Sequence, residues 1–321
     1  MRHFLIFLLS FITFSTVASA QTEFWKHEWP NTDFGKSDVP FIEILSGGPP
    51  RDGIPAIDNP QMIRVDQSKN IPNREPVMVV ELDGETARAY PIRYLMWHEI
   101  ANDTVGGTPI AVTFCPLCNS GIIFDRRVSG KTLTFGVSGK LRNSDMIMFD
   151  RETESWWQQY SGTGIVGAQT GRKLKKLPGW MESWGAFKAR NPDGLVMAEP
   201  KSSRRYGQNP YAGYDSLDRP FLYNGEMPPH GIEPLSRVVV VKKRAWPLER
   251  LRKLNEITEK GVTISWIAGT ASALDAAKIG QGKDVGSIRV KNAKGQDIAH
   301  DVAFAFAFHA FHPNGKWMLG N

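Results

Sequence analysis

The chain contains only two cysteines, Cys115 and Cys118, separated by two residues. Disulfide bonds between distant loops therefore cannot hold this fold together, and its stability must come from a hydrophobic core. The composition allows such a core, because 41% of the 321 residues are hydrophobic and 22% are charged. At roughly 150 residues per domain, this length corresponds to about two domains or one large one. The two sulfur atoms must serve a local purpose.

Residues 1–20 have the parts of a secretory signal peptide. Arg2 supplies the positive charge, residues 4–14 form an apolar run, and Ala18, Ser19 and Ala20 are small residues suited to cleavage. The apolar run is shorter than the roughly 20 residues that span a bilayer. We therefore expect cleavage near Ala20, a mature chain without a transmembrane segment, and a periplasmic or secreted protein.

The formal net charge is mildly positive, +6. The basic residues fall in short, scattered clusters, and none of the known nucleic-acid-binding motifs accompanies them. We expect no nucleic-acid partner. The partner class that remains is an unknown small ligand or another component of the cell envelope.

The pattern of strands and helices predicts a strand-rich α+β fold, in which two weakly repeated hairpin-helix-strand units surround a central antiparallel meander. An extended N-terminal arm is expected at 21–74, and the first unit, with the cysteines and the meander, at 75–190. A long segment rich in Pro, Gly and Tyr follows at 191–232, and the second unit occupies 233–321. The long segment either covers a groove or packs on the surface.

The repeat is indicated by matching short motifs. Ala89-Tyr90-Pro91 in the first unit corresponds to Ala245-Trp246-Pro247 in the second, and each precedes a predicted helix. Two further segments have an expected structure: 177–190 is predicted to be helical, and 302–308 alternates like a strand. Since the second unit has no cysteine, the first unit is expected to carry the site.

The strongest local signal is the segment from Phe114 to Gly121, which contains Cys-Pro-Leu-Cys between two apolar strands. A thioredoxin-like motif would be followed by a helix, whereas here a strand follows. A strand, a cysteine-bearing turn and a second strand are typical of a metal-binding knuckle. Asn119 suits the left-handed backbone conformation that such a turn needs.

The chain has no second Cys-x-x-Cys, so further ligands must come from other residue types. We predict His98 as one ligand, because its helix leads into the cysteine-bearing strand; bonding of its ring to a backbone carbonyl is the alternative. His309 and His312 either contribute an imidazole or close a strand. Two thiolates with one or two imidazoles suit Cu(I), Zn(II) or Fe.

A second polar group precedes and includes paired tryptophans. It could line a pocket, but turn formation and core packing explain it without a function, and we favour that interpretation. Its members are Arg142, Asn143, Ser144, Asp145, Trp156, Trp157 and Gln158.

Several motifs together resemble an exported bacterial family catalogued as a domain of unknown function. They are Leu82-Asp83-Gly84, Ala89-Tyr90-Pro91, Trp97-His98-Glu99-Ile100, Asn102-Asp103-Thr104-Val105-Gly106-Gly107, Phe114-Cys115-Pro116-Leu117-Cys118, Phe135-Gly136-Val137-Ser138-Gly139, Asp150-Arg151-Glu152-Thr153 and Phe311-His312-Pro313. The resemblance covers nearly the whole mature chain and implies export and a Cys-Pro-Leu-Cys signature, but no activity. It places His312 in a shared motif and so favours His312 over His309; Asn119 replaces the glycine common in the family.

Three functions remain open. The first is an exported protein that binds Cu, Zn or Fe through Cys115, Cys118, His98 and His312, with or without redox activity. The second is a thiol–disulfide redox protein that uses the same cysteines. The third is a non-catalytic binding or scaffold module with a local disulfide, in which tryptophans and the tyrosine-rich segment bind a partner or an envelope glycan.

Overall fold

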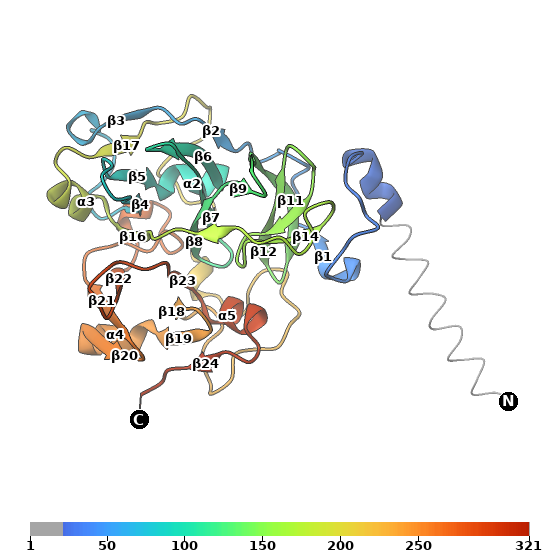
Figure 1. Cartoon of the computed structure of the whole chain (residues 1–321). Helices are drawn as coiled ribbons and strands as arrows, with labels where there is room; N and C mark the ends of the chain where they lie inside the picture. Colours follow the sequence, from blue (N-terminus) through green and yellow to red (C-terminus); the bar gives the residue numbers. More distant parts are fainter. Residues whose placement is uncertain (1–21, 321) are drawn as a thin grey trace.

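The computed structural model describes residues 22–320, so the predicted signal peptide lies outside the described residues (Figure 1). The fold is strand-rich, as predicted, and its helices are short. Residues 22–28 are helical, and the later helices are α2 (Ile92–His98), α3 (Trp184–Arg190), α4 (Leu248–Leu254) and α5 (Ala305–Phe311). None of the helices at 22–320 is long and apolar enough to cross a membrane.

Residues 44–197 form three five-stranded sheets and a small ribbon. One sheet consists, in spatial order, of β16 (Trp180–Ser183), β4 (Pro76–Val80), β5 (Arg88–Pro91), β17 (Leu195–Met197) and β3 (Met62–Arg64). The next consists of β15 (Lys175–Lys176), β8 (Ser120–Asp125), β7 (Thr108–Cys115), β6 (Ile100–Val105) and β2 (Ile57–Asp58). The third consists of β1 (Ile44–Ser46), β11 (Phe135–Arg142), β12 (Asp145–Asp150), β13 (Trp156–Gln158) and β14 (Thr163–Val166), and the ribbon of β9 (Arg127–Val128) and β10 (Lys131–Thr132).

The C-terminal part forms two further sheets. The four-stranded sheet consists of β23 (Asp301–Phe304), β18 (Arg237–Val241), β19 (Arg244–Pro247) and β24 (Lys316–Trp317). The three-stranded sheet consists of β20 (Glu256–Glu259), β21 (Val262–Ile267) and β22 (Ser287–Asn292). In Figure 1 these orange and red sheets lie below the teal sheets of the first half, and the sheet that contains β11 and β12 lies to their right.

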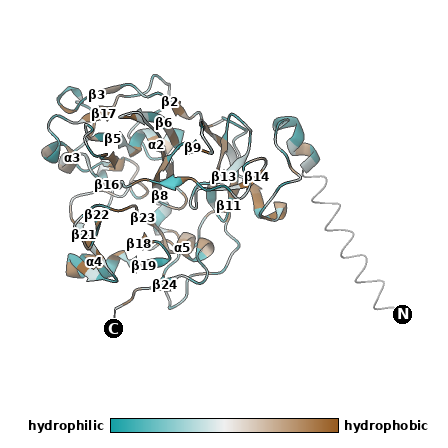
Figure 2. Cartoon of the chain, viewed as in Figure 1, coloured by the Kyte–Doolittle hydropathy of each residue, from teal (hydrophilic) through white to brown (hydrophobic). Residues whose placement is uncertain are grey.

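One hydrophobic cluster runs through both halves of the molecule. It includes the cysteines, Tyr214 of the long segment and Phe304 at the end of β23. Figure 2 shows apolar and polar residues interspersed along the ribbon, for example in α4. The cysteine-bearing turn is therefore packed where the two halves meet.

The segment predicted as an extended arm packs closely on the third sheet. Trp25 and Trp29 meet Trp156 edge-on, with ring centroids 5.0 and 5.4 Å apart. Both rings are buried. The helix at 22–28 is only about two turns long. Burial of these aromatic rings offsets the conformational entropy that is lost when so short a helix forms.

The predicted helix after Pro91 is present as α2, but two other local predictions were wrong in part. The segment 177–190 begins as β16 before it becomes α3. The alternating segment 302–308 is a strand only to Phe304 and then continues as α5, so His309 lies on a helix. Phe306, Ala307 and Phe308 are all buried. A run of consecutive buried apolar residues has no polar face, so its hydrophobic periodicity does not distinguish a strand from a helix.

Candidate metal centre

The cysteine-bearing turn joins two strands, as predicted. Strand β7 ends at Cys115, β8 begins at Ser120, and these two residues are paired across the antiparallel ladder. The N–H of Asn119 donates to the Pro116 carbonyl over 3.1 Å. Asn119 has φ 51°, the left-handed conformation that asparagine adopts at low cost. The turn brings the side chains of Cys115 and Cys118 to the same place.

Asp145 reaches the cysteines from a different hairpin. Strands β11 and β12 are joined by Asn143 and Ser144, which have φ values of 52° and 58°. Positive φ at both central residues is the mark of a tight type I′ hairpin. The thiol of Cys118 donates to the Ser144 carbonyl over 3.5 Å, so the two turns touch directly.

The two turns create a compact group of possible metal ligands. One donor atom from each of Cys115, Cys118 and Asp145 lies within 4.8 Å of the other two, and all three residues are buried. Oδ2 of Asp145 accepts hydrogen bonds from the Gln158 amide and the Tyr160 N–H, at 2.6 and 2.9 Å. Oδ1 is buried without a hydrogen-bond partner among the described residues.

Burial dominates the electrostatics of the group. It raises the pKa of both thiols, an effect to which neighbouring acids add. Burial also raises the pKa of Asp145 to about 6, although hydrogen bonds to its carboxylate oppose the shift. The carboxyl of Glu99, at the end of α2, has a pKa raised to about 8 by burial and by Asp145. Several buried acidic groups thus lie close together, and each makes ionisation of the others less favourable.

The C-terminal half holds the turn from the opposite side. The N–H of Phe304 donates to the Cys118 carbonyl over 2.9 Å, and the Asn119 amide donates to the Val302 carbonyl over 3.3 Å. In each of these two hydrogen bonds, one partner lies on β23 and the other on the cysteine-bearing turn. The position of the cysteines therefore depends on the second unit, although that unit contributes no cysteine.

The long segment 191–232 covers the turn. The hydroxyl of Tyr214 donates to the Leu117 carbonyl over 3.2 Å and accepts from the N–H of Phe221, also over 3.2 Å. Tyr214 begins a short 3-10 helix, Tyr214–Ser216. Tyr214 thus brings the long segment into contact with the cysteine-bearing turn.

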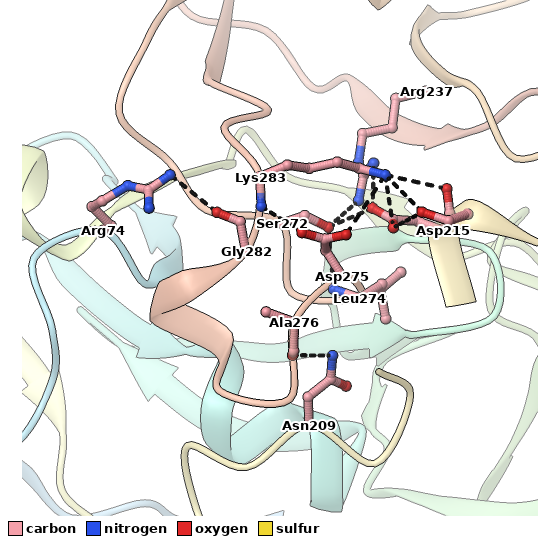
Figure 3. A network of polar contacts seen from close by, with 11 residues as sticks. Arg74, Asn209, Asp215, Arg237, Ser272, Leu274, Asp275, Ala276, Gly282 and Lys283 are labelled. Carbon is pink, nitrogen blue, oxygen red and sulfur yellow. Dashed lines mark hydrogen bonds and ion pairs between the residues drawn. The ribbon is translucent and has the colours of Figure 1, made fainter. Parts of the chain in front are cut away.

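The neighbouring residue, Asp215, anchors this cover to the second unit (Figure 3). Its buried carboxylate meets Arg237 at 2.9 Å, Lys283 at 3.0 Å and the hydroxyl of Ser272 at 2.6 Å. Burial alone would raise the pKa of Asp215, but these partners outweigh burial and hold the pKa below its usual value. Asp215 is therefore a charged anchor for Tyr214.

His98 does not join the group. Its Nδ1 lies 2.7 Å from the Pro55 carbonyl oxygen, and its Nε2 lies 2.6 Å from the hydroxyl of Tyr206. Both nitrogens are thus occupied, and burial lowers the pKa of the ring. The contact with Pro55 matches the alternative that the sequence left open, a histidine bonded to a backbone carbonyl.

His312 also lies outside the group of Cys115, Cys118 and Asp145. It follows α5, and its ring packs near those of Tyr160 and Phe308, with centroid distances of 6.0 and 5.5 Å. Burial lowers the pKa of His312. His309, on α5, has its Nε2 3.8 Å from the Glu226 carboxylate. The structure therefore brings together the two predicted cysteines and neither predicted histidine.

The sequence interpretation undervalued Asp145 and did not single out Glu99. Asp145 belongs to the second polar group, for which turn formation and core packing is the interpretation that the sequence favours. The structure places Asp145 and Gln158 beside the cysteines, whereas Trp156 and Trp157 are buried in the core. The usable signal was an acidic residue directly after an Asn-Ser hairpin turn, since a charge that starts a buried strand needs a partner.

The family described as "Protein of unknown function (DUF3179)" matches residues 51–315. No curated protein and no solved structure matches the chain. The matched range contains both cysteines, Asp145, Glu99 and most of the described fold. The chain belongs to the DUF3179 family, a family of unknown function.

Proposed function

We propose that the protein binds one transition-metal ion through Cys115, Cys118 and Asp145. The observation that carries this proposal is the convergence of three buried donor atoms within 4.8 Å of one another. The free Oδ1 of Asp145 supports it, because a buried carboxylate oxygen without a partner is costly unless a cation or a donor satisfies it.

The donor set favours Zn(II) among the ions considered, with Fe and Cu as the other outcomes of the test. Two thiolates and a carboxylate are all common zinc ligands, whereas Cu(I) prefers soft donors alone. Ionisation of the three residues places three negative charges in a buried site, and a divalent cation compensates two of them. Three protein ligands leave a fourth position of a tetrahedral ion open, which is the arrangement of catalytic rather than structural zinc sites.

Gln158 supports this role for Asp145. Its amide donates to Oδ2 over 2.6 Å and fixes the carboxylate through the oxygen that the ion does not need. The Tyr160 N–H does the same over 2.9 Å. Such outer contacts orient metal ligands and tune their affinity.

An internal duplication is part of the proposal, with the first copy carrying the site and the second supporting it. The spatial orders β16-β4-β5-β17 and β23-β18-β19-β24 correspond strand for strand. The helices α2 and α4 each contain seven residues, and the residues that end them have nearly the same backbone: Glu99 has φ 58° and ψ −30°, and Asn255 has φ 60° and ψ −35°. The acidic Glu99 of the first copy corresponds to Asn255, a neutral amide, in the second.

A thiol–disulfide function is less well supported by the same residues. The two sulfur atoms lie within 4.8 Å of each other, and both cysteines are free. However, both are buried, and burial raises the pKa of each thiol, whereas exchange needs an accessible thiolate. A local structural disulfide, the third alternative, would remove the thiolates that metal binding requires.

The test is elemental analysis of protein purified without oxygen. We expect about one equivalent of metal per chain in the wild type and little in Cys115→Ser, Cys118→Ser or Asp145→Asn. His98→Gln and His312→Gln are the matched comparisons, because they remove imidazoles that lie outside the group. Retention of metal by the three donor variants, or its absence from wild-type protein after zinc is supplied, would refute the proposal.

We further propose that the protein is exported and cleaved near Ala20. The support is the order of Arg2, an apolar run at 4–14 and three small residues at 18–20. The expected result is a mature N-terminus near Gln21 in the periplasmic or secreted fraction, read by mass spectrometry. Recovery of the uncleaved chain in the cytoplasm would contradict export.

A further inference from the structure

An apolar cavity of about 520 Å³ lies beside the candidate metal centre. Its walls include Leu117 and Met146, each next in sequence to a proposed ligand, and Tyr214 of the covering segment. Leu217 and Phe221 also line it and are half exposed, at 54% and 50%. A cavity of this volume, apolar inside and with apolar residues at the surface, suits a small organic molecule rather than a polypeptide.

Two polar groups in this cavity have no partner. No hydrogen bond to the Glu99 carboxyl or to the Tyr211 hydroxyl occurs within 22–320, although both residues line the cavity. Glu99 is only 7% exposed. The charge of Glu99 contributes to raising the pKa of Tyr211, after burial, which is consistent with their being neighbours. Because both residues line the cavity, a molecule inside it can supply the hydrogen-bond partner that neither group has within the protein.

The backbone of Glu99 adds a second reason to look for a role. Glu99 has φ 58°, a conformation that glycine or asparagine adopts more readily than glutamate. Asn255, at the corresponding end of α4, has φ 60°. A glutamate at this position raises the free energy of the folded state, because its backbone is strained and its acidic side chain is largely buried. Strained residues of this kind concentrate at functional sites.

We propose that this cavity binds a small alcohol or phenol with an apolar body, whose hydroxyl group hydrogen-bonds to Glu99 and Tyr211. A hydroxyl both donates and accepts. It can therefore donate to a Glu99 oxygen and accept from the Tyr211 hydroxyl, which leaves neither group unpaired. The apolar lining then takes up the rest of the ligand.

This inference does not depend on the bound metal. Its residues are Glu99, Tyr211 and the cavity walls, and none of them is among the three proposed metal ligands. If both proposals hold, the ligand lies next to the open metal position. If metal binding fails, the cavity and its two unpaired groups still remain, so each proposal is tested on its own.

The experiment uses 2-naphthol as the probe and naphthalene as the same ring system without the hydroxyl. Binding to the mature chain is measured by 2-naphthol fluorescence, with naphthalene as a competitor, once with EDTA and once with zinc. We expect 2-naphthol to bind up to about 100-fold more tightly than naphthalene, since its hydroxyl makes two hydrogen bonds and each contributes roughly a factor of ten. The preference should persist in EDTA.

Glu99→Leu and Tyr211→Phe are each expected to weaken 2-naphthol binding about tenfold while changing naphthalene binding less than twofold. Glu85→Gln, on an exposed turn, is the control and should change neither. Tyr211→Phe removes a single oxygen and keeps the test decisive if Glu99→Leu does not fold. Absence of 2-naphthol binding, or an unchanged preference in Tyr211→Phe, overturns the inference whatever the metal content.

Discussion

The side-chain amide of Gln158 donates a hydrogen bond to Oδ2 of Asp145 over 2.6 Å, and both side chains are buried. Gln158 ends β13, and Asp145 begins the neighbouring strand β12. The contact crosses the sheet and holds the carboxylate while Oδ1 stays free. The third sheet, which carries no cysteine, thus orients the carboxylate that lies beside the two cysteines.

Replacing Gln158 by Leu should weaken zinc binding by about 10–100-fold, the usual effect of losing a residue that orients a metal ligand. The metal ligands themselves remain, so some binding should persist. Competition with a chromophoric chelator measures the affinity. Gln61→Leu changes an exposed glutamine and should leave the affinity unchanged; equal affinities for wild type and Gln158→Leu would remove Gln158 from the site.

Metal binding should weaken steeply as the pH falls. Burial raises the pKa of both thiols above the usual value, so the ion must displace their two protons at neutral pH. Burial also raises the pKa of Asp145 to about 6, so below that pH a third proton must leave. The affinity should fall about 100-fold per pH unit near pH 7 and about 1000-fold per unit well below pH 6.

Proton release provides the direct measurement. A pH indicator in weak buffer should report about two protons per zinc ion at pH 7, because each bound thiol must lose one. At pH 5 the wild type should release about three, because the carboxyl of Asp145, with a pKa of about 6, is then protonated as well. A constant affinity from pH 5 to 8 would contradict a site built from these three residues.

The local features of the site could be predicted from the sequence, but its assembly could not. The two strands, the turn and the left-handed Asn119 follow from neighbouring residues, and all are present. Asp145 meets the cysteines because one hairpin packs against another, and no pattern along the chain encodes that contact. His98 was chosen for its proximity in sequence, yet its ring points to Pro55 and Tyr206.

Glu99 shows a different limit of the sequence. It follows directly after a helix and before β6, where a charged residue normally reads as a solvent-exposed helix end. Tyr211, which lines the same cavity as Glu99, lies more than a hundred residues later in the chain. Asn255 ends α4 with nearly the same backbone conformation as Glu99. Under the proposed duplication, a comparison of these two positions is the sequence signal that sets Glu99 apart.

Glu99→Gln should stabilise the metal-free protein at pH 8 and change it little at pH 5. Burial and Asp145 raise the pKa of Glu99 from 4.5 to about 8 in the folded state. The folded state therefore binds the proton more tightly than the unfolded state, and this contribution to stability is lost as the pH rises from 4.5 to 8. Glutamine does not ionise, so the variant keeps this stability at high pH. At pH 8 its free energy of unfolding should exceed that of the wild type by a few kcal/mol.

Denaturant unfolding in the presence of EDTA measures this effect at both pH values. Glu85→Gln serves as the control, because Glu85 is exposed and its substitution should give the same small change at pH 5 and pH 8. A Glu99→Gln variant that is destabilised equally at both pH values would mean that its carboxyl makes a favourable contact in the folded protein, contrary to its unpaired position.

Asp215→Asn should destabilise the protein by about 3–5 kcal/mol, because it leaves the buried Arg237 without its charged partner. It should also loosen Tyr214 over the turn, so Cys115 and Cys118 should react faster with a thiol reagent. Thermal unfolding and the rate of thiol modification measure the two effects. Glu249→Gln breaks a pair whose side chains are 77% and 72% exposed and should change neither, since exposed ion pairs contribute little. Destabilisation without faster modification would mean that Asp215 supports the second unit but does not anchor the cover.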